Sequence, residues 1–280
     1  MTIAFAVSFL SLIVGLIGFI FYSFDGQRKY FRAATFATLI STVALTVLII
    51  LQGFSYGFRP VDFLVNPCNI LAWLMLVTYF FAAYKFKIRI LGALFIPIVA
   101  VLMIIPAFGK KVDPHTVSTL KSPFFINLHV LLLMVSFVFF FLTFSQAVIY
   151  ILKSRALKSH HSEALDTELP SLGKLQKMFE HTFNLGWISM TVGFILAILN
   201  IAVSQSSLEL DPKITSGLAI WIAYSILFFT YQAGRIDTRN LARAVTLLFI
   251  AILAFWLAFS MGLIGPGTKA LEKPPAIEGN

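Results

Sequence analysis

The chain has 280 residues, of which 59% are hydrophobic and 12% charged, with a formal net charge of +9. A soluble domain has about 45–50% apolar and about 25% charged residues, so this chain has too little polar surface to cover a water-soluble particle. The same shortage of polar residues excludes an intrinsically disordered chain. We therefore expect an integral membrane protein, in which each spanning helix needs about 20 predominantly apolar residues.

Eight apolar runs, separated by charged residues or by Pro and Gly, predict an all-α polytopic membrane bundle of about eight transmembrane helices. In chain order they cover residues 2–24, 33–54, 67–84, 90–108, 124–152, 183–203, 214–233 and 241–263. The first run has no basic segment before it, so we interpret it as a retained helix and not as a signal peptide. We expect a single domain of residues 1–264, with a polar connection at 153–180 and a loose tail at 265–280.

The basic residues alternate along this predicted topology. Fourteen of the 21 lie in the connections that follow the first, third, fifth and seventh helices: Arg28, Lys29, Arg32, Lys85, Lys87, Arg89, Lys153, Arg155, Lys158, Lys174, Lys177, Arg235, Arg239 and Arg243. The remaining seven are Arg59, Lys110, Lys111, Lys121, Lys213, Lys269 and Lys273. By the positive-inside rule, the first group faces the cytoplasm and both termini lie outside. We expect the chain to lie in a bacterial inner (plasma) membrane, with lipid as its partner. The positive-inside pattern there accounts for the net positive charge, so nucleic acid is not needed as a partner.

Residues able to carry chemistry are few. Cys68 is the single cysteine, so the chain has no CxxC pair for thiol exchange and no CxxCH motif for covalent haem attachment. We expect Cys68 to be a small buried hydrophobic residue. All 12 Asp and Glu residues lie in the expected connections or tail, which argues against a pump that relays protons through the membrane.

His129 differs from the other histidines because it lies inside an apolar run, near the expected outer membrane surface. An imidazole in such a span needs a partner or a ligand. Ser136, Thr143 and Tyr150 follow it at steps of seven, so the four polar residues lie nearly on one helix face. Two hypotheses account for this arrangement: a hydrogen-bonding seam between helices, or an imidazole directed at a metal centre.

A second candidate segment comes at the start of the seventh run. Asp211, Pro212 and Lys213 precede the apolar residues, and Trp221 and Tyr224 lie within them. Asp-Pro is a favourable helix start, with the aspartate as N-cap and the proline as first helical residue. Tryptophans within spans are more often packing or interface anchors than cofactor contacts. The residues alone therefore leave open whether this segment is structural or forms a binding site.

Together, these features resemble the cytochrome c assembly proteins. The resemblance rests on the run NLHVLLLMVSFVFFFLTFSQAVIYIL, a basic connection, a helix with Gly186, Thr191 and Gly193, and then DPK followed by WIAY. It points to the CcsA/ResC/CcmC superfamily and, within it, to the smaller HemX-like and YpjD-like members, and it is strongest over residues 123–262. It implies a haem platform on the outer side of the membrane, where a tryptophan-rich loop and flanking histidines hold the haem.

The resemblance also implies roles for individual residues. His129 matches the family's first outer histidine, which ligates the iron. Asp211 and Lys213 match the end of the family motif WGxxWxWDPK, and Trp221 and Tyr224 match the helix that follows it. These five positions are therefore the expected haem-binding residues.

The chain departs from the family pattern at several positions. Ser204, Leu208 and Leu210 stand at the three tryptophan positions, and Phe229 stands near the place of a further family histidine. His115, in the neighbouring outer loop, is a weaker candidate for a second iron ligand. The tryptophan-rich motif is therefore degenerate in this chain.

Three functions remain as hypotheses. The first is haem handling in cytochrome c biogenesis, with haem as cofactor and apocytochrome c or other assembly proteins as partners. The second is a haem-free membrane scaffold or accessory subunit derived from the same family, and the third is a small-solute permease, which the lack of a sequence repeat disfavours. We see no catalytic nucleophile or acid–base pair, so we do not expect a self-sufficient enzyme.

Overall fold

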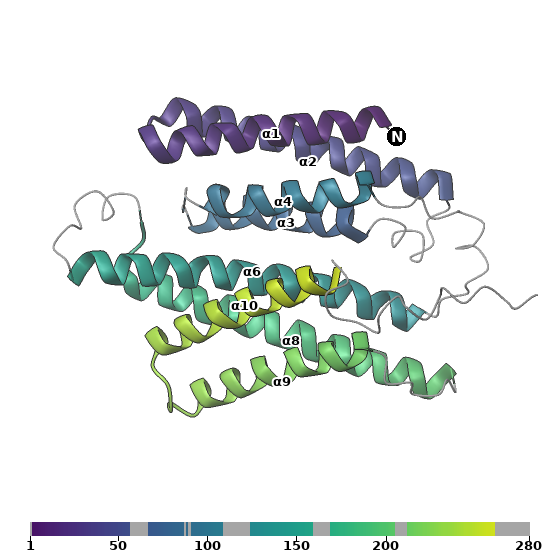
Figure 1. The fold of residues 1–280 in the computed structure, drawn as a ribbon, viewed down its shortest axis with the longest axis vertical. Helices are drawn as coiled ribbons and strands as arrows, with labels where there is room; N and C mark the ends of the chain where they lie inside the picture. The colour runs from purple at the N-terminus through teal and green to yellow at the C-terminus, as the bar shows by residue number, and fades with distance from the viewer. Residues whose placement is uncertain are drawn as a thin grey trace, which may run out of the picture. The chain divides into compact units, whose positions relative to one another are not determined.

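The fold was established as a computed structural model, which describes residues 2–56, 67–86, 88, 91–108, 124–158, 169–204 and 212–260. The described residues form eight α-helices and no β-strand (Figure 1). The helices are α1 (Thr2–Asp25), α2 (Arg28–Tyr56), α3 (Pro67–Phe86), α4 (Leu91–Phe108), α6 (Phe124–Lys158), α8 (Leu172–Ser204), α9 (Pro212–Gln232) and α10 (Thr238–Ser260). The expected all-helical membrane bundle is confirmed.

The chain divides into two compact units, Met1–Ser207 and Leu208–Asn280. In the first unit, α1 packs against α2 and α4, α3 packs against α2 and α4, and α6 packs against α8. A contact between α3 and α6 joins these two groups of helices. In the second unit, α9 and α10 pack against each other.

The connection expected at 153–180 is wrong over most of its length, because α6 continues to Lys158 and α8 already begins at Leu172. Loss of apolar character marks the edge of the hydrocarbon core, but a helix can continue beyond that edge, where water satisfies its polar side chains. The start of α8 is set by Ser171, whose carbonyl oxygen accepts hydrogen bonds from the amides of Lys174 and Leu175, each at 3.0 Å. Sequence patterning thus located the span but not the helix.

The turn between α1 and α2 is tighter than expected, since α2 begins at Arg28 instead of residue 33. Gly26 has a φ of 65°, a left-handed conformation that glycine adopts readily at a helix end. Its amide donates to the carbonyl oxygen of Tyr22 at 2.9 Å, which closes the last turn of α1. The two helices can therefore run side by side with two residues between them.

Among the described residues, six helices are long and apolar enough to cross a membrane. The six segments are Ile3–Asp25, Arg28–Phe54, Cys68–Lys85, Leu128–Leu157, Leu172–Asn200 and Thr238–Phe255. Within α4, the stretch Leu91–Ile104 is apolar but shorter. The chain is therefore a multi-pass membrane protein, whereas the expected total of eight spans and the outward position of both termini remain predictions.

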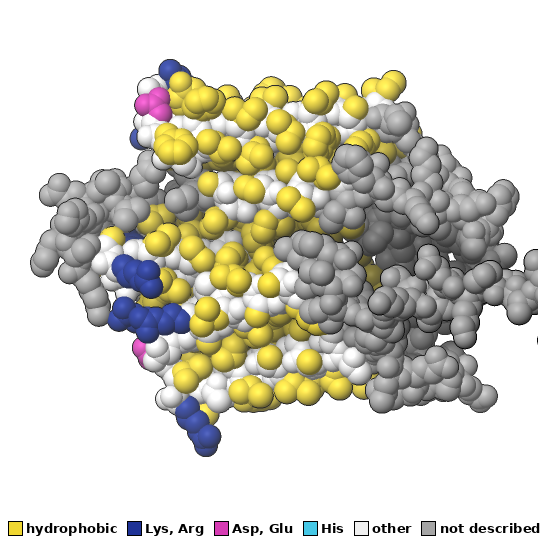
Figure 2. Space-filling model, viewed as in Figure 1, with side chains coloured by type: hydrophobic (Ala, Val, Ile, Leu, Met, Phe, Trp, Pro, Cys, Tyr) yellow, Lys and Arg dark blue, Asp and Glu magenta, His cyan; other side chains and the backbone are white. Residues whose placement is uncertain are grey.

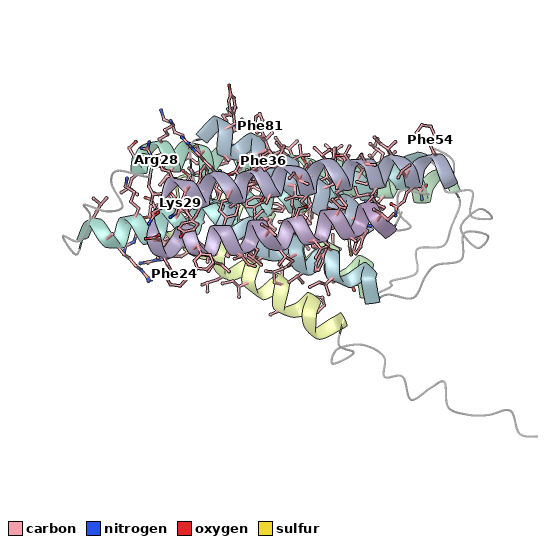
Figure 3. All side chains as sticks on the ribbon, turned by 90° about the horizontal axis from the view of Figure 1, so that it is seen from above. Phe24, Arg28, Lys29, Phe36, Phe54 and Phe81 are labelled. Atoms are coloured by element: carbon pink, nitrogen blue, oxygen red, sulfur yellow. The ribbon has the colours of Figure 1, made fainter. Side chains whose placement is uncertain are left out.

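Large apolar side chains point outward from the first unit. Phe24 is 88% exposed and Phe54 is 71% exposed, and Figure 3 shows them at opposite ends of the α1–α2 pair, with Phe36 and Phe81 also directed outward. Arg28 and Lys29 lie at the corner where α1 meets α2 (Figure 3). Hydrophobic side chains cover long stretches of α1 and α2, and a few basic atoms with an acidic group lie at their left-hand end (Figure 2). This distribution suits lipid along the helices and water at their ends.

Aromatic rings connect four helices of the first unit. The ring centroid of Phe19 in α1 lies 6.0 Å from that of Tyr79 in α3, which lies 6.1 Å from that of Phe95 in α4. Phe95 in turn packs edge-on against Phe141 in α6, with 4.7 Å between centroids. All four side chains are almost fully buried. These contacts, of the kind preferred between aromatic rings, hold α6 against the N-terminal helices.

Candidate functional site

The candidate site lies where α6 meets α8 in antiparallel orientation. The imidazole Nδ1 of His129 lies 2.7 Å from the carbonyl oxygen of Gly193. Seven residues further along α6, the hydroxyl of Ser136 donates to the carbonyl oxygen of Gly186 at 2.9 Å. A step of seven residues up α6 therefore corresponds to a step of seven down α8. This repeat is characteristic of helices that cross at a shallow angle.

Glycine makes both of these contacts sterically feasible. A Cβ atom at Gly186 would lie 3.0 Å from the Phe140 ring, and one at Gly193 would lie 3.2 Å from Cδ2 of Leu133. Neither helix position has room for a side chain without displacement of its neighbour. Small residues at helix interfaces in membranes allow this close approach, and here they bring backbone carbonyl groups within reach of side chains on α6.

The contact between the helices continues with buried polar side chains. The hydroxyl of Thr143 lies 3.1 Å from that of Thr182, which donates to the amide oxygen of Gln146 at 2.8 Å. Thr143 and Gln146 are fully buried, and Thr182 nearly so. Among the described atoms, the amide nitrogen of Gln146 has no hydrogen-bond partner.

We refer to this set of residues as the α6–α8 seam. It consists of His129, Ser136, Thr143 and Gln146 on α6 and Thr182, Gly186 and Gly193 on α8. The seam hypothesis is therefore correct for His129, Ser136 and Thr143, while Tyr150 takes no part in the described bonds. Hydrogen bonds of this kind hold helices together in lipid.

The bond to Gly193 determines which nitrogen of His129 carries the proton in the neutral ring. A carbonyl oxygen can only accept, so Nδ1 must donate, and Nε2 is left with its lone pair. The His129 side chain is only partly buried, and the Phe194 ring packs edge-on against the imidazole with 6.5 Å between centroids. The seam bond and a metal-directed imidazole are therefore compatible, since they use different nitrogens.

His129 and the basic residues lie at opposite ends of the seam. Lys153 is 24 residues beyond His129 on the same helix, which is about 36 Å along the axis and comparable to a hydrocarbon core of about 30 Å. Arg155 lies close to Lys153 on α6, and Lys174 and Lys177 lie near the start of α8. If the basic end faces the cytoplasm, as the positive-inside rule predicts, His129 faces outward.

The other residues expected to bind haem are described only in part. Trp221 is half-buried and Tyr224 fully buried in α9, within the second unit, whereas His129 belongs to the first unit. Lys213 is the second residue of α9. Asp211 and His115 lie outside the described residues. The structure thus brings His129 together with Ser136 and Thr143 along one seam.

Sequence reasoning missed the residues of α8 that bind the polar face of α6. From the sequence, Gly186 and Gly193 stand out only as part of the family pattern, and Thr182 lies just before the apolar run at 183–203. A signal was present, since the two glycines are separated by seven residues, as are His129 and Ser136. Equal spacing on two consecutive helices is what an antiparallel seam requires.

Comparison with known proteins is consistent with a multi-pass helical membrane protein. The family described as Cytochrome C assembly protein matches residues 61–267. The cytochrome c biogenesis protein CcsA of Pyropia yezoensis is 24% identical over 302 residues, covering 91% of this chain and 92% of the relative. CcsA of Guillardia theta is 22% identical, covering 78% of this chain and 79% of the relative.

Another relative carries a different name. The protein HemX of Brevibacillus brevis is 26% identical over 242 residues, covering 84% of this chain and 87% of the relative. No solved structure matches this chain. The family match extends over most of the chain and includes α3 to α10, with the whole α6–α8 seam. The chain therefore belongs to the cytochrome c assembly protein family.

Proposed function

We propose that this protein handles haem in cytochrome c biogenesis, presenting it on the outer side of the membrane with Nε2 of His129 bound to the iron. The observation that carries the proposal is the 2.7 Å bond from Nδ1 of His129 to the carbonyl oxygen of Gly193. Histidines that ligate metals commonly donate their other ring N–H to a backbone carbonyl in this way.

The residues around His129 support this proposal. A single histidine is enough to hold the iron in several classes of haem protein. Leu132 and Leu133 are half-buried on the same stretch of α6, and Phe194 packs against the imidazole from α8. Haem, when bound, supplies the iron and the porphyrin that a cytochrome requires. His129 would donate one nitrogen to the iron, the Gly193 carbonyl would orient the imidazole, and the neighbouring apolar side chains would contact the porphyrin.

The family resemblance adds further residues to this proposal. Asp211, Trp221 and Tyr224 would contact the haem, and the ammonium of Lys213 would pair with a propionate. His115 is the weaker candidate for a second iron ligand. On this view the protein works in a bacterial inner membrane with apocytochrome c or other assembly proteins as partners.

A second candidate function is a haem-free scaffold or accessory subunit that acts by packing against a partner complex. The observation that favours it is in the sequence: Ser204, Leu208 and Leu210 replace the tryptophans of the family motif. On this view the bond between His129 and Gly193 serves only to hold α6 and α8 together. The two functions differ in whether His129 meets iron.

A spectroscopic experiment separates them. The protein, expressed with ample haem and purified in detergent, should show a Soret band that shifts or is lost in His129→Ala. The matched control is His181→Ala, which removes an exposed histidine of the same chain from α8 and should leave the spectrum unchanged. Haem-free wild-type protein, recovered in a stable complex with a partner, would contradict the haem proposal and support the scaffold.

A further inference from the structure

We infer that Gly193 is a positioning residue for the iron ligand: its carbonyl oxygen fixes the neutral imidazole of His129 with the proton on Nδ1 and keeps Nε2 available to the metal. This inference rests on the proposed function for its consequence at the iron. The inference depends on the protonation of Nδ1 of His129, which can be measured without haem.

The geometry supports a strong and directed bond. A separation of 2.7 Å is at the short end of the range for N–H···O hydrogen bonds. His129 is only partly buried and is the second residue of the apolar span Leu128–Leu157, where an unpaired polar group is costly. The hydrogen bond to Gly193 therefore holds Nδ1 of His129 toward α8.

The absence of a side chain at position 193 is part of this arrangement. A Cβ atom there would lie 3.2 Å from Cδ2 of Leu133 and 3.6 Å from both the carbonyl oxygen of His129 and Cβ of Leu132. An alanine would press on the Leu133 side chain, and a valine would push α8 away from α6. Glycine thus lets the carbonyl oxygen reach the imidazole.

The consequence at the iron follows from the donated proton. An N–H group that donates to a carbonyl makes the opposite ring nitrogen more basic and fixes the orientation of the ring. A more basic nitrogen ligand would stabilise the oxidised form of a bound iron. Loss of the bond should therefore weaken haem binding and raise the midpoint potential of the bound iron.

The first experiment measures the ring proton directly in haem-free protein. Nitrogen-15 NMR of histidine-labelled protein, with the signal of His129 assigned by its loss in His129→Ala, should show Nδ1 protonated and Nε2 unprotonated at a pH where the ring is neutral. A proton on Nε2, or equal population of both forms, would overturn the inference. Because no haem is needed, this result is independent of the proposed function.

The second experiment compares two glycines of the same seam. Gly193→Ala and Gly193→Val should lower haem affinity, with the larger substitution approaching a loss of about 10–100-fold, and should raise the midpoint potential. Gly186→Ala and Gly186→Val are the matched controls, because Gly186 also contacts α6 closely but its carbonyl oxygen binds Ser136. Equal effects from both glycines would mean that helix separation alone matters, and the inference would fail.

A third variant avoids any change in the helix backbone. Replacement of His129 by Nδ-methylhistidine keeps Nε2 as an iron ligand but removes the proton that Gly193 accepts. Haem should still bind through Nε2, with lower affinity and a higher midpoint potential than in the wild-type protein. Unchanged haem affinity and midpoint potential in this variant would overturn the inference. Absence of a Soret band from the wild-type protein would count against the proposed function alone.

Discussion

The ammonium group of Lys153 donates to the carbonyl oxygen of Pro170 at 3.0 Å and to that of Leu169 at 3.2 Å. Lys153 is only 4% exposed, so these carbonyl groups replace much of its water. The contact ties the residues before α8 to the last turns of α6, at the end of the seam opposite His129. Lys153 thus links the end of α6 to the residues that precede α8.

Replacement of this lysine should loosen the start of α8. Hydrogen bonds to a charged group contribute about 1.5–3 kcal/mol, so we expect Lys153→Met to lower the free energy of unfolding by a similar amount. Hydrogen–deuterium exchange should also become faster in the first turns of α8. Lys177→Met is the control, because Lys177 is exposed on α8, and it should behave as the wild type. Equal stability of the two variants would show that the Lys153 contacts contribute little.

The polar cluster in the middle of the seam should show coupled energetics. Thr182→Val removes the hydroxyl that donates to Gln146, and we expect a loss on the order of 1 kcal/mol, as is typical for such bonds in membranes. The double variant Thr182→Val with Gln146→Met replaces both partners and should be less destabilised than the sum of the single variants. Reversible unfolding in mixed detergent measures these values, and strict additivity would contradict the bond.

Close packing between α1 and α2 gives a third prediction. A Cβ atom at Gly18 would lie 2.9 Å from Cβ and 3.2 Å from Cα of Ala34, so Gly18→Ala should cost about 1–3 kcal/mol. At Gly173, in the first turn of α8, a Cβ atom would meet nothing within 4 Å. Gly173→Ala should therefore be neutral or stabilising by up to about 1 kcal/mol. Thermal unfolding of the two variants in the same detergent compares their stabilities. Equal stabilities would contradict the close contact between α1 and α2.

Membrane orientation can be tested with single cysteines in a Cys68→Ser background. The positive-inside rule predicts that the turn between α1 and α2 faces the cytoplasm. Gln27→Cys, at an exposed position of that turn, should react with a membrane-impermeant maleimide only in inverted vesicles. Ile3→Cys, near the start of α1 and 80% exposed, should react only from the outside. The opposite pattern would reverse the predicted topology and place His129 on the cytoplasmic side.

The polar face of α6 was predictable from the sequence, because it is marked by the types and spacing of its side chains. The polar steps of seven from His129 are visible in α6, and they identified the seam face. The partner of His129 was not predictable, since a backbone carbonyl such as that of Gly193 leaves no mark beyond the glycine itself. The residues before Phe183 were also misjudged, because a helix that extends past the hydrocarbon core loses its apolar pattern without losing its hydrogen bonds.

The ring contacts that begin at Phe19 have a consequence for how this chain is built. The family match starts at residue 61, so α1 and α2 lie before it. Phe19 nevertheless packs on Tyr79 within the matched region, and Ser8 lies 4.0 Å from the sulfur of Met103 in α4. Removal of residues 1–56 would turn a protein-facing surface of α3 and α4 toward lipid. The N-terminal pair is thus part of the packing around α3 and α4, which extends beyond the region that the family model matches.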